Sequence, residues 1–351
     1  MRLMCDLGNG FFRHMKTSMK GSGMNVRWGD SWWATRDKAT LLALTPYPAL
    51  ATLVALALWA PVMTRAAEAG KTFATPEEAV AALVQATSAE SGAQLRAIFG
   101  PAAADIQNPD RVQATNEFNA FTAALNQTNL LVRESETNYV LEVGTNLWPF
   151  PVPIVKKDGR WFFDTEAGKQ EILNRRIGKN ELAVLQVMRA YVGAQREYAS
   201  LDRNGDEVLE YAQHLASTPG TKDGLYWPED LDGTTSPLGP LVADAREEGY
   251  TVQAKGQEQT RIPFDGYYFK ILTRQGKHAP GGKYSYIING HMIGGFALVA
   301  WPAEYGESGI MTFIVNQQGR VYQKNLGPKT EKLAPAMKTY DPDPSWELSP
   351  E

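Results

Sequence analysis

The chain has 351 residues, a formal net charge of −4 and 43% hydrophobic residues. A chain of that length folds as one body that buries about 75% of its unfolded surface, or it divides into two domains. The acidic balance and the lack of a basic, aromatic-interleaved patch argue against a nucleic-acid partner. Cys5 is the single cysteine, which excludes disulfides, a cysteine nucleophile and cysteine-ligated metal sites from the chain beyond it.

Residues 1–69 have the features of a secretory signal peptide. An uncharged apolar run at residues 49–60 follows basic residues and precedes a small-x-small site that ends at Ala69. This order is typical of an export signal, so we expect cleavage after Ala69 and a periplasmic or secreted protein. The alternative is a retained membrane anchor, because the run reaches about 20 residues when it is extended back to Leu41. Met19 or Met24 would serve equally well as the initiator, so the residues before Met24 are interpreted as an over-extended start.

Residues 70–178 are predicted to form a first domain that begins with helices. Thr75-Pro76-Glu77-Glu78 is a helix start, since threonine caps free amides and glutamates complement the helix dipole. A second short helix is expected at residues 94–99. A third begins near Pro109, and its apolar face is formed by Phe118, Phe121 and Leu125.

After these helices the apolar period changes to two, which predicts four antiparallel strands between residues 130 and 164. The last two strands are joined by a turn at Asp158-Gly159. Helices followed by an antiparallel sheet define an α+β fold. This order, with the ending KKDGRWFFD, resembles the nuclear-transport-factor-2-like fold, in which helices cover a curved sheet. Asp164 is interpreted as a helix N-cap, and we expect no catalytic carboxylate in this half.

Gly178 is expected to end the last helix of the first domain, and residues 179–330 to form a second domain. A long helix at residues 180–201 should open this domain. Its apolar residues recur at intervals of three and four, which predicts packing against a sheet: Val184, Val187, Tyr191, Ala194, Tyr198 and Leu201. Residues 331–351 are interpreted as a C-terminal tail.

An acidic loop, DRNGDEVLEYAQ, follows this helix. Its candidate metal ligands match positions one, three, five and nine of the EF-hand calcium loop: Asp202, Asn204, Asp206 and Glu210. Two positions depart from that pattern, because Glu207 replaces the sixth-position glycine and Gln213 replaces the twelfth-position glutamate. The alternative is an Asx-rich turn that ends one helix and caps the next. No cofactor is expected apart from calcium as a candidate ligand of this loop.

The next stretch is irregular and rich in glycine, proline, serine and threonine. Its aromatic residues, with one from the following sheet, are a candidate binding face for a sugar or peptide: Tyr226, Trp227 and Trp301. The alternative is that these rings cover a core beneath a long loop. Nearby carboxylates would suit a glycan or peptide hydrolase if two of them lined one groove: Asp223, Asp230 and Asp232.

Residues 267–326 are predicted to form one antiparallel sheet. Its five candidate strands are bounded by glycine, proline or asparagine: YYFKILT, KYSYII, GGFALVAW, IMTFIV and RVYQK. Asn289-Gly290 predicts a tight hairpin, since both residues accept positive φ. Residues 316–319 predict a longer turn that ends in a left-handed glycine. Gly294-Gly295 inside a strand pattern indicates a bulge or a close backbone approach.

Histidines provide one more candidate metal site. His278 lies in a Gly/Pro-rich loop and His291 follows the Asn289-Gly290 turn, so the two are expected to lie close together. With Asp265 they would form a possible metal site, and the alternative is that both are exposed turn residues. The chain contains no Gly-x-Ser-x-Gly, His-Glu-x-x-His or phosphate-loop motif.

Several long segments together resemble a bacterial exported family known as domain of unknown function 2950. They are FATPEEAVAALVQA, VKKDGRWFFDTEAGKQEILNRRIGKNE, EYAQHLASTPGTKDGLYWP, FDGYYFKILTRQG and YIINGHMIGGFALVAWPAEYGESGIMTFIVNQQGRVYQKNLGP. The resemblance extends over almost all of the chain after the leader. It implies an exported protein of two parts and supplies no functional residues.

The second half also resembles the soluble heads of type IV pilins and pseudopilins, in which a long helix precedes an antiparallel meander. It departs from them because its helix is internal and amphipathic and because the leader is that of ordinary export.

These features predict an exported cell-envelope protein that binds an envelope ligand or protein and has no catalytic role. A membrane association is expected only if the leader is retained. The alternatives are an envelope glycan or peptide hydrolase and an accessory of pilin-like or secretion assemblies.

Overall fold

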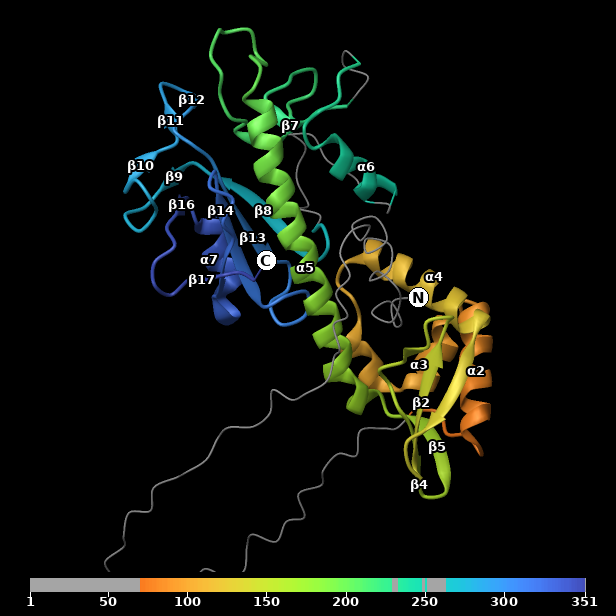
Figure 1. The fold of residues 1–351 in the computed structure, drawn as a ribbon. Helices are drawn as coiled ribbons and strands as arrows, with labels where there is room; N and C mark the ends of the chain where they lie inside the picture. The colour runs from red at the N-terminus through yellow and green to blue at the C-terminus, as the bar shows by residue number, and fades with distance from the viewer. Residues whose placement is uncertain (1–69, 229–232, 248–249, 251–262, 351) are drawn as a thin grey trace, which may run out of the picture. The chain divides into compact units, whose positions relative to one another are not determined.

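The computed structural model describes residues 70–228, 233–247, 250 and 263–350, all of which belong to one compact unit of the chain. The predicted signal peptide and its alternative, a retained anchor, lie outside the described residues. Within the described ranges, no helix is both long enough and apolar enough to cross a membrane. A group of helices precedes the first sheet, a long helix precedes the strands of the second, and the sheets are mainly antiparallel, which confirms the α+β class (Figure 1).

Three α-helices open the described chain, and the first begins at the predicted cap, Thr75. They are α2 (Pro76–Ser88), α3 (Gly92–Phe99) and α4 (Arg111–Gln127), with a 3-10 turn at Pro101–Ile106 between the last two. The side chain of Thr75 accepts the Glu78 amide, and Asp110 accepts the amides of Val112 and Gln113. These side-chain acceptors satisfy amides that have no partner inside the helix.

The first sheet has the strand order β1-β2-β4-β5, and β3 pairs with β2. Its members are β1 (Asn129–Arg133), β2 (Asn138–Val143), β3 (Trp148–Pro149), β4 (Ile154–Lys157) and β5 (Arg160–Phe163). Asp158 and Gly159 both have positive φ, 51° and 79°, so the predicted turn between β4 and β5 is confirmed. Phe99, Phe121 and Phe150 are among the rings that pack helices on this sheet.

The long helix is a single element, α5 (Thr165–Tyr198), capped by Asp164 as predicted. The expectation that Gly178 ends a helix is wrong, because the residue has a helical neighbour on each side. An exposed glycine weakens a helix but does not break it when the flanking turns are good helix formers. The predicted apolar stripe from Val184 to Tyr198 is buried, whereas Leu201 lies beyond the helix end and is 57% exposed.

The second sheet has the strand order β17-β15-β14-β13-β8, and α5 packs against β13 and β14 (Figure 1). Its strands are β8 (Tyr267–Leu272), β13 (Ala297–Pro302), β14 (Met311–Asn316), β15 (Tyr322–Asn325) and β17 (Glu347–Leu348). All six residues of β13 are buried because neighbouring strands cover both of its edges and packed side chains cover its faces. The predicted turn at residues 316–319 is confirmed, with Gly319 at φ 79°.

The run KYSYII is not a strand of this sheet, so that prediction is wrong. Its residues divide between two short ribbons, in which β10 (Tyr284–Ser285) pairs with β9 (Arg274–Gln275) and β11 (Ile287–Ile288) pairs with β12 (His291–Met292). The Asn289-Gly290 hairpin is confirmed, but it joins β11 to β12. Gly295 has φ 142°, a backbone state open mainly to glycine, and there the chain turns from the ribbon into β13.

The predicted C-terminal tail is part of the fold. It contains α7 (Thr330–Ala336), β16 (Thr339–Tyr340) and β17, and these strands pair with β9 and β15. The remaining elements are β6 (His214–Ala216), β7 (Gly224–Tyr226), α6 (Gly239–Glu247) and a 3-10 turn at Gly327–Lys329.

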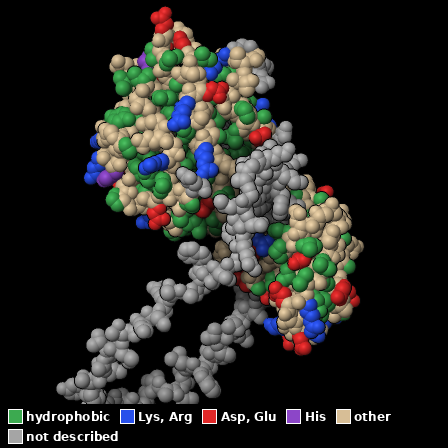
Figure 2. Space-filling view, viewed as in Figure 1, with side chains coloured by type: hydrophobic (Ala, Val, Ile, Leu, Met, Phe, Trp, Pro, Cys, Tyr) green, Lys and Arg blue, Asp and Glu red, His purple; other side chains and the backbone are tan. Residues whose placement is uncertain are grey.

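Buried hydrophobic side chains form two separate clusters, one from Phe73 to Ile172 and one from Val184 to Tyr340. These two clusters are consistent with the predicted division into two domains at residue 178. That division stays a prediction. On the face in view, acidic and basic side chains are interspersed, and no continuous basic band crosses its described residues (Figure 2).

Candidate functional site

The acidic loop after α5 is ordered by its first carboxylate. The two oxygens of Asp202 accept the backbone amides of Asn204, Gly205 and Glu207 at 3.2, 2.7 and 2.8 Å. The Glu207 amide, followed by the Gly205 amide, holds the pKa of the Asp202 carboxyl below its ordinary value. Glu207 itself has φ 65°, so this chain adopts the left-handed turn of the sixth position without a glycine there.

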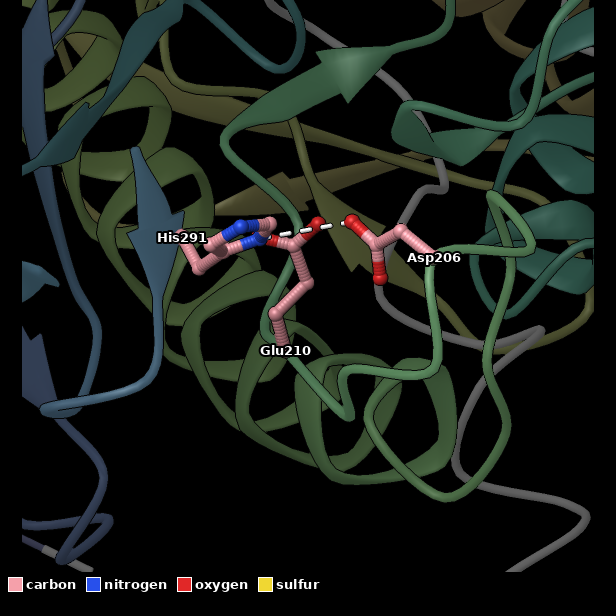
Figure 3. Close-up of side chains that lie close together, drawn as sticks. All are labelled: Asp206, Glu210 and His291. Carbon is pink, nitrogen blue, oxygen red and sulfur yellow. Dashed lines mark ion pairs between the residues drawn. The ribbon is translucent and has the colours of Figure 1, made fainter. Parts of the chain in front are cut away.

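The central feature is a cluster of Asp206, Glu210 and His291, in which two carboxylates face one imidazole (Figure 3). The His291 Nδ1 atom lies 3.4 Å from Asp206 Oδ2 and 3.4 Å from Glu210 Oε2. One potential ligand atom from each of the three residues lies within 4.8 Å of the other two. Within the described ranges, these three side chains offer ligand atoms that are close enough to one another to hold a metal ion.

Neighbouring groups fix both carboxylates in place. The Val208 amide donates to Asp206 Oδ1 at 2.9 Å, and the Met292 amide donates to Glu210 Oε2 at 3.1 Å. The Asn204 side-chain amide donates to both carboxylates, at 2.8 Å and 3.1 Å. Such second contacts orient ligating groups and restrict their rotation.

The loop is also attached to the β11–β12 hairpin, which carries the histidine. The Tyr211 amide donates to the Met292 carbonyl at 2.8 Å, and Gln213 Nε2 donates to the Gly290 carbonyl at 2.7 Å. Gln213 therefore binds the hairpin backbone. A glutamate, the residue expected at the twelfth position of a calcium loop, would not make this hydrogen bond, because a carboxylate has no proton to donate.

The four predicted metal ligands thus separate into two kinds. Asp206 and Glu210 lie in the cluster, whereas the oxygens of Asp202 bind backbone amides and Asn204 donates to the two carboxylates. Sequence reasoning missed His291 as the third member of this group. The one available signal was its position directly after the Asn289-Gly290 turn, which places a side chain on a short, well-defined hairpin.

The other predicted histidine site does not form. His278 Nδ1 lies 3.1 Å from Asp341, whose carboxylate also accepts the His278 amide at 2.9 Å. His291 instead faces Asp206 and Glu210, and Asp265 does not belong to this group or to another metal-ligating group in the described ranges. His278 lies in the turn between β9 and β10, whereas His291 belongs to β12, and each contacts a different carboxylate.

The predicted aromatic face is part of the core. Tyr226, Trp227 and Trp301 are 9%, 1% and 2% exposed and belong to the second hydrophobic cluster. The Trp227 Nε1 atom donates to the Thr234 carbonyl at 3.1 Å, which satisfies its one polar group. Their burial gives no support to ligand binding by these rings.

The carboxylates proposed for a hydrolase are only partly described. Asp223 accepts the Thr218 amide at 2.7 Å and the hydroxyls of Thr218 and Thr221 at 2.8 and 2.9 Å. Burial opposes ionisation of Asp223, but these hydrogen bonds outweigh it, so its pKa lies below the ordinary value. A general acid needs the opposite shift. Asp230 and Asp232 lie outside the described residues.

Fold and site together define an α+β protein with a carboxylate–imidazole cluster between a loop and a hairpin. The chain belongs to the family described as "Protein of unknown function (DUF2950)", whose model matches residues 70–348. The resemblance stated from the sequence is therefore confirmed for the family, whereas the resemblance to pilin heads is not. No curated protein and no solved structure matches the chain.

Proposed function

We propose that this protein is exported to the cell envelope and acts there by binding, and that its binding centre takes a divalent cation at Asp206, Glu210 and His291. The leader pattern of residues 1–69 supports export. The mixed α+β architecture supports a finer division into a nuclear-transport-factor-2-like domain at residues 70–178 and a pilin-head-like domain at residues 179–330. Each has its own hydrophobic cluster.

The observation that carries the cation proposal is the convergence of two carboxylates and an imidazole from segments far apart in the chain (Figure 3). Two like charges at this separation repel each other, and a positive ion between them relieves that repulsion. Both carboxylates are held in position by backbone amides from Val208 and Met292. The arrangement is therefore suited to hold a cation.

Binding is favoured over hydrolysis because the described carboxylate of the hydrolase alternative, Asp223, is occupied by hydrogen bonds from Thr218 and Thr221. The accessory role in pilin-like assemblies rests on the resemblance of the second half alone.

The cation proposal is tested by thermal unfolding of the metal-free mature protein with and without added Ca²⁺, Mn²⁺ or Zn²⁺. An ion present at a hundred times its Kd stabilises the fold by about 2.7 kcal/mol, so Tm should rise by several degrees. Glu210→Gln should lose most of this rise. Glu207→Gln is the matched control, since it makes the same change at an exposed residue of the same loop outside the cluster. Equal rises in both variants would contradict the proposal.

Export is tested separately by the mass of the protein recovered from a periplasmic fraction. The expected N-terminus is Gly70. Recovery of the full leader in the membrane fraction would instead support the retained anchor.

A further inference from the structure

The donor atoms of the cluster distinguish among cations. Calcium takes six to eight oxygen ligands, typically from carboxylates, carbonyls and water. The cluster presents an imidazole nitrogen, the Nδ1 atom of His291, beside one oxygen each from Asp206 and Glu210. Imidazole suits zinc, copper, nickel and iron, whereas calcium and magnesium prefer oxygen.

The other side chains at ligand positions of the calcium-loop pattern are engaged elsewhere. Both oxygens of Asp202 accept backbone amides, and the Gln213 side chain is directed to the Gly290 carbonyl. Asn204 presents its amide protons, not its oxygen, to the two carboxylates. Of the side-chain ligands of an EF-hand, only those from Asp206 and Glu210 remain directed to the cluster.

The spacing of the donor atoms fits a small four-coordinate ion. Zinc binds nitrogen and oxygen at about 2.0–2.2 Å, so neighbouring corners of its tetrahedron lie about 3.3–3.6 Å apart. The separations from His291 Nδ1 to Asp206 Oδ2 and to Glu210 Oε2 are both 3.4 Å. Two edges of the triangle of donor atoms therefore already have the length that a tetrahedral ion requires.

From these three observations we infer that the cation is a borderline first-row ion of the Zn²⁺ class, bound by His291 Nδ1 and one oxygen each from Asp206 and Glu210. Three protein donors leave the fourth position for water or for an outside ligand. The inference rests on the proposed function, because it names the class of cation that the proposed centre takes. It replaces calcium, the ion that the loop sequence suggested.

The experiment compares Zn²⁺, Mn²⁺, Ca²⁺ and Mg²⁺ binding to the metal-free full mature chain, by calorimetry and by chelator competition. The Kd for Zn²⁺ should be at least about tenfold lower than that for Ca²⁺, in line with the donor set. His291→Ala should weaken Zn²⁺ binding at least about tenfold. Co²⁺ serves as a visible-absorption probe, and its spectrum should change in the same variant.

His278→Ala is the matched control, because His278 is also paired with one carboxylate, Asp341, but lies outside the cluster. It should leave the Kd for Zn²⁺ unchanged. Equal melting of the metal-free variants and the parent protein would show that each is folded.

The outcomes separate the two claims. Calcium binding that is as tight as zinc binding, or zinc binding that survives His291→Ala, would overturn the inference while the cation-binding proposal stands. Binding of none of the four ions would overturn both.

Discussion

At the scale of single residues, Glu117 is an acidic side chain that the fold largely removes from water. It lies on α4 with 6% of its surface exposed, and its carboxylate contacts the Lys179 ammonium on α5. Burial raises the pKa of Glu117 to about 7, and the attraction of Lys179 and a hydrogen bond from Asn108 only partly oppose that rise. A buried acid of this kind makes the stability of the fold depend on pH.

The sign of that dependence follows from the direction of the shift. The folded state holds the Glu117 proton more tightly than the unfolded state, so this contribution to stability is fully present below about pH 4.5. It is lost as the pH rises through about 7. We expect Glu117→Gln, which stays neutral, to be more stable than the parent at pH 8 by on the order of 2–4 kcal/mol and nearly equal at pH 5. Denaturant unfolding at both pH values measures the difference.

Glu136→Gln is the control for this experiment, because the same change is made at an exposed glutamate. It should alter stability little at either pH. A Glu117→Gln variant that loses stability equally at both pH values would contradict the assignment of the proton to Glu117.

At the scale of elements, α5 makes a prediction about two of its glycines. A Cβ added at Gly178 would have nothing within 4 Å, so alanine should stabilise the helix by about 0.5–1 kcal/mol. Gly168 is the matched control, since its added Cβ would lie 2.8 Å from the Pro151 carbonyl oxygen and 2.9 Å from the Val152 Cα. Gly168→Ala should therefore destabilise the protein. Chemical denaturation of both variants compares the two changes.

Loss of stability in Gly178→Ala would indicate that the chain needs a break in the helix at this position, as the sequence pattern suggested. The prediction thus also tests the continuity of α5.

Elements with a local signal were predictable and those that depend on distant partners were not. Thr75 and Asp164 accept amides three residues ahead, and Asn289-Gly290 forms a turn from its own φ preferences. The run KYSYII has strand-like residues, but its pairing is decided by β9 and β12. The β-strand propensity of a segment does not determine which strand it pairs with, because any neighbouring strand would satisfy the same backbone N–H and C=O groups.

The candidate site illustrates the same limit. Asp206 and Glu210 could be singled out from the spacing within one loop, as the calcium-loop comparison did. Their neighbour His291 belongs to a hairpin that is attached through Tyr211 and Gln213, and only the folded chain reveals that attachment.

At the scale of the whole molecule, the last residues act as part of the core. Tyr340 has no exposed surface, and its strand β16 pairs with β9. Tyr340→Ala should cost about 3–5 kcal/mol, the loss typical of a large buried ring. Among the described residues the Tyr340 hydroxyl has no hydrogen-bond partner, so Tyr340→Phe should change stability by less than about 1 kcal/mol.

Thermal and denaturant unfolding of these two variants separate loss of the ring from loss of the hydroxyl. A small effect of Tyr340→Ala would mean that the C-terminal residues are the dispensable tail that the sequence suggested.

The direct backbone contact between Tyr211 and Met292 has a consequence for how an ion would enter the protein. Hydrogen bonds from the Tyr211 amide and the Gln213 side chain join the loop to the hairpin, so a cation would find its donors already assembled. The loop would then lose little conformational entropy when the ion binds. Association would be faster than in a protein whose loop must fold around the ion first. Magnetic resonance shifts on ion addition should therefore stay within a few residues of the imidazole, with the rest of the spectrum undisturbed.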